Sequence, residues 1–352
     1  MKFLALSLIS GAAAANLRSP SYYEGEFKKW QIDYGVKFSS PEEESKRLQV
    51  FSDAEDTIAT HNMKNATWTM AHNAYSHLTW EEFRELHAIG QPLPPKPHLL
   101  GLARDESNKH TENGPPEAMV NWWWDDDSGD DDAPSGDGTD WVDSGAVTDV
   151  KDQGSCGSCW SFSTTGALEG AYYIANKELV SFSEQMLVDC DTTDSGCNGG
   201  LMDNAFAWIK DNKGLCKEDD YPYTSGGGTA GTCQTSCTPV EGSTVSSWVD
   251  VKQSDAAMES ALDQQPVSIA IEADQSAFQY YSSGVFTEAC GTNLDHGVLA
   301  VGYGTMDGTD YYRVKNSWGP TWGKDGYIYL ERGSSQTGGQ CGMLMAASYP
   351  VL

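Results

Sequence analysis

The chain has 352 residues, of which 39% are hydrophobic and 21% charged, so it is long enough to bury a sizeable core and to form about two domains. Asp and Glu number 51 against 22 Lys and Arg, which gives a formal net charge of -29. So acidic a chain would be repelled by nucleic acid and by anionic membrane surfaces, and neither is expected as a partner.

Residues 1–15 have the pattern of a secretory signal peptide. Lys2 precedes a short apolar run, and the alanines at 12–15 suit cleavage after Ala15. The run is too short to span a bilayer and no other segment is long and apolar enough, so no membrane anchor is predicted. We expect entry into the secretory pathway, with a lysosome, a vacuole or the extracellular space as destination.

Residues 20–90 are predicted to form a small helical domain. Four aromatic residues recur at spacings of three and four, as on one helix face: Phe27, Trp30, Tyr34 and Phe38. A second helix is expected to begin at Pro41, which follows two serines. Asn65, in the sequon Asn65-Ala66-Thr67, is a candidate glycosylation site in a surface turn.

Residues 91–134 are predicted to be a linker, because seven prolines interrupt any regular element. The stretch from Asp125 to Asp132 is almost wholly acidic, and its expected exposure favours proteolytic cleavage between residues 125 and 139. The preceding Trp122-Trp123-Trp124 has no assigned role.

Residues 135–352 have the composition of a globular domain. A helix is predicted from Cys159 to Asn176, and shorter helices near 183–189 and 202–212. Strands are predicted later in the chain, at Val267–Ile271, 297–303, 311–314 and 327–330. A helical half followed by a strand-rich half indicates an α+β domain with two subdomains and a cleft between them as the default site.

The chain has nine cysteines, all between residues 156 and 341. An odd number in a secretory protein suggests disulfides plus one free thiol. Eight paired cysteines allow about a hundred pairings, so the spacing alone does not give the connectivity.

One cysteine has the surroundings of a nucleophile. Cys159 ends the string Gln153-Gly154-Ser155-Cys156-Gly157-Ser158-Cys159 at the start of the predicted helix, where the positive helix end would stabilise a thiolate. His296 lies downstream in Asp295-His296-Gly297 and can exchange the thiol proton. The family resemblance set out below implies that Asn316 orients the imidazole, with Trp318 shielding their hydrogen bond, and that Gln153 donates to an oxyanion.

Two other functions would also fit part of this sequence. Cys156-Gly157-Ser158-Cys159 is a C-x-x-C motif, as in thiol-disulfide oxidoreductases, although the strand–helix alternation of that class is missing here. That function needs both cysteines to cycle, whereas a cysteine nucleophile needs Cys156 to be permanently bonded elsewhere. A catalytically inactive binding or storage protein is the second alternative, but all four catalytic positions are filled.

Residues from about 139 to 352 resemble papain-like cysteine peptidases of the cathepsin L-like group. The resemblance rests on five strings: Gln153–Phe162, Ser183-Glu184-Gln185, Gly196–Asp203, Asp295-His296-Gly297 and Asn316–Gly326. It implies a fold with a helical left half and a β-barrel-like right half. It also implies an endopeptidase that cleaves polypeptide substrates as a monomer, without a cofactor or a metal ion.

The resemblance also implies pairings and a substrate pocket. The disulfides would be Cys156–Cys197, Cys190–Cys233 and Cys290–Cys341, which leaves Cys216 and Cys237 as a fourth pair. Gly200 would bind the substrate backbone, Asp295 and Trp318 would border the substrate, and a pocket would receive the second residue before the scissile bond. The pocket walls would be Leu201, Met202, Ala270, Leu294 and Ala346. Because they are apolar, Leu, Phe or Val is expected there.

Residues 22–90 resemble the helical propeptide of the same peptidases, which blocks the cleft as an intramolecular inhibitor. The pattern comprises Glu43, Arg47, Phe51, Ile58 and Asn62, with Ala54 where Asn is usual, and a second motif in which Ala71 replaces Gly and His77 replaces Asp. A buried His77 would be costly to protonate, so acid would loosen the segment. The alternative is an exposed His77 that merely fills a turn.

Overall fold

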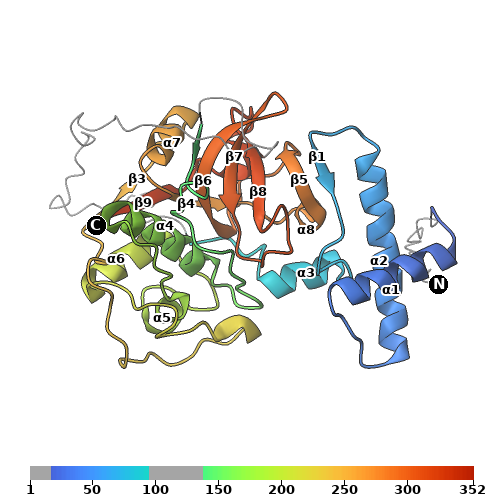
Figure 1. Cartoon of the computed structure of the whole chain (residues 1–352), viewed down its shortest axis with the longest axis horizontal. Helices are drawn as coiled ribbons and strands as arrows, with labels where there is room; N and C mark the ends of the chain where they lie inside the picture. Colours follow the sequence, from blue (N-terminus) through green and yellow to red (C-terminus); the bar gives the residue numbers. More distant parts are fainter. Residues whose placement is uncertain (1–16, 95–137) are drawn as a thin grey trace, which may run out of the picture.

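The computed structural model describes residues 17–94 and 138–352. The expected signal peptide, the Trp122–Trp124 segment and most of the expected cleavage zone lie outside these residues. In Figure 1 the helices α4, α5 and α6 lie below one end of a sheet, and the N-terminal helices extend from its other end. We call residues 17–94 the N-terminal segment and residues 138–352 the C-terminal domain.

The C-terminal domain begins with a helical half. Its helices are α4 (Cys159–Asn176), α5 (Glu184–Cys190) and α6 (Met202–Asn212), followed by the short turn η2 (Ser225–Gly227). Helix α4 is buried over its whole first part, from Cys159 to Tyr172. Gly166 allows its close approach to the sheet, because a Cβ there would lie 2.8 Å from the side chain of Leu299. The predicted bounds of α4 and α6 agree with the structure, and α5 is shifted by one residue.

The second half is built around a nine-stranded sheet with the order β1-β5-β8-β7-β6-β4-β9-β3, and β2 pairs with β6. The strands are β1 (Trp68–Met70), β2 (Thr139–Asp140), β3 (Ser247–Asp250), β4 (Val267–Ile271), β5 (Tyr281–Phe286), β6 (His296–Met306), β7 (Thr309–Lys315), β8 (Tyr327–Glu331) and β9 (Ala347–Val351). Helices α7 (Asp255–Leu262) and α8 (Ser276–Tyr280) and the turn η3 (Gln340–Gly342) complete this half. The four predicted strands are present as β4, β6, β7 and β8.

The N-terminal segment contains α1 (Pro20–Asp33), α2 (Pro41–Asn62) and α3 (Trp80–His87). Helix α2 begins at Pro41 as predicted, with the Ser40 hydroxyl accepting a hydrogen bond from its first turn. The predicted helix through Phe38 is wrong in its extent, because the chain leaves the helix after Asp33 and turns at Gly35 with φ +65°. Phe38 still stacks on Phe27, with ring centroids 5.8 Å apart.

The N-terminal segment also contributes a strand that the helical prediction missed. Strand β1 pairs antiparallel with β5 and so extends the sheet of the C-terminal domain. Gly284 permits this pairing, since its φ is +79° and a Cβ there would lie 2.3 Å from the carbonyl oxygen of Thr67. Asn65 lies in the exposed turn between α2 and β1.

Apolar contact dominates the junction between the two parts. Ile58, Trp68, Met70, Phe83 and Ile89 belong to the same buried cluster as the sheet residues of the C-terminal domain. Both parts are net acidic, with 8 Lys and Arg against 12 Asp and Glu in residues 17–94 and 10 against 28 in residues 138–352, so they cannot attract each other by net charge. In residues 17–94 and 138–352, no helix combines the length and the apolar character needed to cross a membrane.

Candidate active site

The N-terminus of α4 places Cys159 at the boundary between the helical half and the sheet. Cys159 is the free cysteine of the C-terminal domain, and it is 5% exposed. The structure pairs the other eight as Cys156–Cys197, Cys190–Cys233, Cys216–Cys237 and Cys290–Cys341. Because Cys156 is bonded to Cys197, the C-x-x-C motif does not form the redox pair of the oxidoreductase alternative.

His296, the first residue of β6, faces Asn316 at the end of β7. Its Nε2 lies 2.7 Å from Oδ1 of Asn316, and since an amide oxygen only accepts, Nε2 carries the proton. Nδ1 is therefore the unprotonated nitrogen of the neutral ring, and it has no partner among the described residues. The Trp318 indole stacks on the His296 ring at 4.7 Å and separates this pair from solvent.

Cys159 and His296 come together through Gly297. Gly297 lies against the start of α4, since a Cβ on it would lie 3.3 Å from the carbonyl oxygen of Cys159. Burial raises the pKa of this thiol to about 11 and lowers the pKa of His296 to about 4, although the Asn316 bond favours the charged imidazole. Both groups are therefore neutral at neutral pH while the cleft is covered. The position at the helix N-terminus alone would predict a lowered pKa for the Cys159 thiol. Burial has the opposite effect and prevails while the N-terminal segment covers the cleft.

Gln153 is fully buried beside Cys159 and is anchored by Ser317. The Ser317 hydroxyl donates to Gln153 Oε1 at 2.7 Å, and Gln153 N–H donates to the Ser317 carbonyl at 2.9 Å. The Gln153 amide Nε2 donates to the carbonyl of Cys156 at 3.0 Å and, at 3.3 Å, to the carbonyl of His87. Ser317 thus connects the predicted oxyanion donor with its neighbour Asn316.

The N-terminal segment covers this site. His87, the last residue of α3, stacks on Trp318 at 4.8 Å, and its carbonyl oxygen accepts a hydrogen bond from the Gln153 side-chain amide. Beyond α3 the chain continues along the cleft: Gly90 N–H donates to the Asp295 carboxylate at 3.0 Å, and Leu93 N–H donates to the Leu294 carbonyl at 2.8 Å. The segment therefore occupies the positions that a substrate backbone would need.

The expected pocket residues lie together. Met202, Ala270 and Ala346 are buried in one cluster, against which the half-buried Leu294 and Leu93 both pack. Leu201, the N-cap of α6, is 4% exposed, and Gly200 is buried against Trp160 and Asp194. The structure thus brings the predicted pocket residues to the part of the cleft that Leu93 enters.

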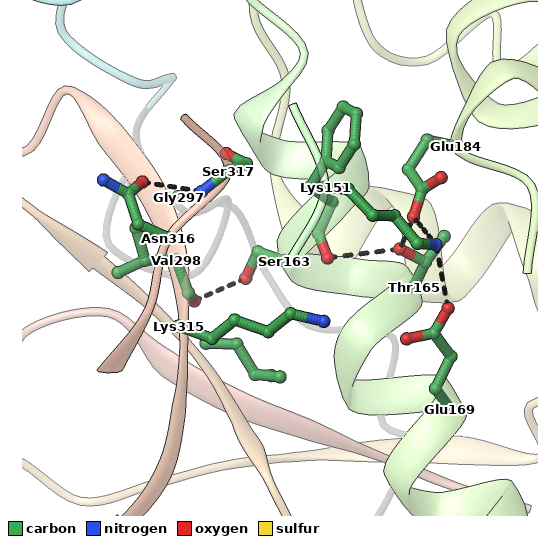
Figure 2. Close-up of a pocket in the computed structure, with 12 residues that line it drawn as sticks. Lys151, Ser163, Thr165, Glu169, Glu184, Gly297, Val298, Lys315, Asn316 and Ser317 are labelled. Carbon is green, nitrogen blue, oxygen red and sulfur yellow. Dashed lines mark hydrogen bonds and ion pairs between the residues drawn. The ribbon is translucent and has the colours of Figure 1, made fainter. Parts of the chain in front are cut away.

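A cluster of buried charges lies behind Asn316, around a small cavity between α4 and β7 (Figure 2). Lys151 forms ion pairs with Glu169 at 3.0 Å and with Glu184. Lys315, which precedes Asn316, donates to Thr148 at 3.0 Å, and burial lowers its pKa to about 8. Charges of both signs therefore link the strand that carries Asn316 to the helical half.

No group of three or more metal-ligating side chains occurs in the part of the chain that the structure describes. The sequence did not single out three residues at this site: Ser317, which occurs in the quoted Asn316 string, and His87 and Tyr223, which have no local signal. Tyr223 donates a hydrogen bond to the carbonyl oxygen of Gln153.

A free cysteine at a helix start, a histidine–asparagine pair across the cleft and a segment lying over both define a thiol hydrolase held in an inactive form. The family model described as papain family cysteine protease matches residues 136–351, and that of the cathepsin propeptide inhibitor domain matches residues 27–83. The chain belongs to the papain family of cysteine proteases and is made as a proenzyme with an inhibitory propeptide.

Named proteases are similar to this chain over most of its length. "Probable cysteine protease RD21B" of Arabidopsis thaliana is 43% identical over 340 residues, which cover 95% of this chain and 68% of the relative. "Cysteine proteinase COT44" of Brassica napus is 42% identical, with coverage of 92% and 95%. Among solved structures, the proform of the ragweed pollen allergen Amb a 11 superimposes with a TM-score of 0.75 at 32% identity and covers 95% of this chain and 96% of its own.

Proposed function

We propose that the mature protein hydrolyses internal peptide bonds through the thiolate of Cys159. The observation that carries this proposal is the His296 ring, whose Nε2 is held by Asn316 and whose Nδ1 is left without a partner, while the adjacent Gly297 packs against the backbone of Cys159. Nδ1 takes the thiol proton, and the sulfur attacks the scissile carbonyl carbon. The carbonyl oxygen becomes an oxyanion, which accepts hydrogen bonds from the Gln153 amide and the Cys159 backbone N–H.

The remaining steps return the enzyme to its starting state. His296 gives its proton to the leaving amine as the C–N bond breaks, which leaves an acyl group on the sulfur. A water molecule then gives a proton to His296 and attacks the thioester. Collapse of the second tetrahedral intermediate releases the carboxylic acid product and regenerates the Cys159–His296 pair.

The substrate preference is for an apolar residue at the second position before the scissile bond. Leu93 supports this proposal, because the protein's own leucine packs against the buried cluster that contains Met202, Ala270 and Ala346. Each of these walls is uncharged, so an arginine would lose its hydration there without gaining a partner. Leu, Phe or Val is therefore favoured at this position.

The proenzyme is latent near neutral pH and opens in acid. His77, proposed from the sequence as the trigger, is half-buried, and burial followed by the nearby Arg47 lowers its pKa. His87 lies closer to the reacting groups and is 1% exposed, and burial lowers its pKa to about 3. Protonation of either ring opposes the closed state, and cleavage between residues 125 and 139 would then release the mature domain.

The four disulfides support a location in the secretory pathway, such as a lysosome, a vacuole or the extracellular space. The exposed turn at Asn65 is a site at which a glycan can be attached during secretion. We further propose a signal peptide over 1–15, a linker over 91–134 and a monomeric mature enzyme from residues 135–352.

Single substitutions test the chemical proposal. Cys159→Ala and His296→Ala should abolish hydrolysis of a peptide substrate, while a chelator should leave the wild-type rate unchanged. Added active enzyme should cut the Cys159→Ala proenzyme to a product of mature size that resists further digestion, which shows that the domain is folded. Normal turnover by Cys159→Ala protein would refute the assignment of the nucleophile.

A further inference from the structure

Tyr223 reaches from an outer loop of the helical half to the backbone around the nucleophile. Its hydroxyl donates to the carbonyl oxygen of Gln153 at 2.8 Å, and the Ser158 hydroxyl lies 2.8 Å from the same oxygen atom of Tyr223. A phenol has one proton to give, so Ser158 is the donor in the second bond. The two bonds form a chain from Ser158 through Tyr223 to Gln153.

The two residues joined by this chain of hydrogen bonds are the first oxyanion donor itself and the neighbour of the second. Gln153 supplies the side-chain amide, and Ser158 immediately precedes Cys159, whose backbone N–H is the second donor. Ser317 holds the Gln153 side-chain oxygen and backbone N–H, but the Gln153 carbonyl is held by Tyr223. Since Gln153 is fully buried, the loss of that bond would leave its carbonyl without an obvious replacement.

The loop that carries Tyr223 is itself firmly placed. Tyr223 N–H donates to the Glu218 carboxylate at 2.7 Å, and the Tyr223 ring packs edge-on against Phe162 of α4 at 5.0 Å. The Cys216–Cys237 disulfide closes the segment around it. A second contact lies beside Tyr223, where Ser155 N–H donates to the Gly226 carbonyl at 2.8 Å.

Backbone freedom at Gly154 makes such a restraint necessary. Gly154 follows Gln153 with φ +59°, and a Cβ there would lie 2.4 Å from the Gly226 carbonyl oxygen. Glycine can leave this conformation at little steric cost, so the Gln153–Gly154 peptide is free to rotate unless a hydrogen bond holds it. Two hydrogen bonds restrain this peptide: Asp152 Oδ1 accepts from the Gly154 N–H at 2.8 Å, and Tyr223 donates to the Gln153 carbonyl at 2.8 Å.

We propose that Tyr223 is a positioning residue for the oxyanion site, and that it acts by fixing the Gln153 backbone relative to the start of α4. This inference rests on the proposed function, because it assumes that Gln153 stabilises the oxyanion of peptide hydrolysis. Tyr223 does not touch the reacting atoms, so its removal should weaken transition-state stabilisation and leave the thiol itself intact.

The test compares Tyr223→Phe with Tyr221→Phe in the full chain after acid activation. Tyr221 is a matched control, because its buried hydroxyl lies two residues away on the same loop but bonds to Asp189. Rates are normalised to the number of Cys159 thiols that iodoacetamide alkylates under native conditions, so that equal amounts of free thiol are compared. Tyr223→Phe should lower kcat by about five- to tenfold with KM nearly unchanged, the loss expected for one hydrogen bond that acts in the transition state.

Two further measurements distinguish positioning from a general structural role. Alkylation of Cys159 by iodoacetamide forms no oxyanion. Its rate should therefore change by less than about twofold in Tyr223→Phe. In a Gln153→Ala background the Tyr223→Phe change should have almost no further effect on kcat, because the donor it positions is gone.

Three outcomes would overturn the inference: an unchanged kcat in Tyr223→Phe, an equal fall in hydrolysis and alkylation, or a full additional loss in the Gln153→Ala background. A fall of the same size in Tyr221→Phe would also overturn it, since the loop and not the bond would then be responsible. If alkylation of Cys159 left wild-type hydrolysis intact, the proposed function itself would fail, which is a different result.

Discussion

Replacing His87 by Asn should blunt the acid activation of the proenzyme. The His87 ring is enclosed by aromatic rings, with Trp318 at 4.8 Å, Tyr75 at 4.8 Å and Phe83 at 4.7 Å. Neither ring nitrogen has a hydrogen-bond partner among the described residues, and the charged form would face the ring of His296. A proton on His87 therefore has no carboxylate to stabilise it in the closed state.

The size of the effect follows from proton linkage. Burial lowers the pKa of His87 to about 3 in the closed proenzyme, and a released, solvated histidine has a pKa near 6.5. The closed state is therefore fully favoured above about pH 6.5 and loses stability as the pH falls toward 3, since the open state binds the proton first. Between pH 7 and pH 4.5 the open population should rise about 75-fold. This corresponds to a loss of roughly 2.5 kcal/mol in the stability of the closed state relative to the open state.

The assay measures cleavage of an inactive proenzyme. Cys159→Ala proenzyme, with and without His87→Asn, is incubated with a fixed trace of active enzyme from pH 7 to pH 4.5. The ratio of the two rates at each pH cancels the pH dependence of the added enzyme. If cleavage follows the open population, the acid-to-neutral ratio should fall by up to about 75-fold in His87→Asn.

Matched variants separate His87 from the other histidines. His77→Asn should have a smaller effect, because its ring is half-buried and already hydrogen-bonded to the carbonyl of Ala74. His72→Asn should have the smallest effect, since Glu55 lies 3.0 Å from its ring and can pair with the charged form. An unchanged acid-to-neutral ratio in His87→Asn would refute the reasoning about buried charge at this position.

Three further predictions concern the mature domain. Asn316→Ala should lower kcat about 100-fold and leave a residual rate, because the imidazole loses its orientation but not its proton chemistry; a progress curve with a peptide substrate measures this. Ala346→Glu should raise kcat/KM for Arg over Leu at the second position by about tenfold or more, as read from a peptide library. Glu169→Gln should destabilise the domain by about 3 kcal/mol or more in thermal unfolding at pH 6, because Lys151 keeps only Glu184 as an ion-pair partner and Lys315 loses a carboxylate that favours its charged form.

Each of these predictions has an outcome that contradicts it. Full activity in Asn316→Ala would mean that the His296 ring needs no orienting bond. An unchanged preference in Ala346→Glu would place the pocket floor elsewhere. Equal unfolding temperatures for Glu169→Gln and the wild type would show that the buried cluster contributes no stability.

The sequence predicted best what local signals encode. Helix α4 was predicted with the bounds that the structure has, because Cys159 to Asn176 form one long pattern that follows a glycine-rich loop. The sequence also predicts Gln153, Cys159, His296 and Asn316 as site residues, since each occurs in a short and specific string. These signals need no knowledge of long-range contacts.

What the sequence could not predict depends on pairing across the chain. Strand β1 has three residues, and its place in the sheet exists only because β5, more than two hundred residues later, offers Gly284 as a partner. His87 and Tyr223 have no motif around them that indicates their roles. Their importance comes from hydrogen bonds with Gln153, from which His87 and Tyr223 are separated by 66 and 70 residues in sequence.

The most direct test of the central claim is covalent labelling of the acid-activated enzyme. A peptidyl chloromethyl ketone with leucine at the second position is added until hydrolysis stops, and the labelled peptide is identified by mass spectrometry. The account predicts one label per active site, on the Cys159 sulfur, and protection of that site in the proenzyme at pH 7. A label on another residue, or continued hydrolysis after Cys159 is fully modified, would contradict it.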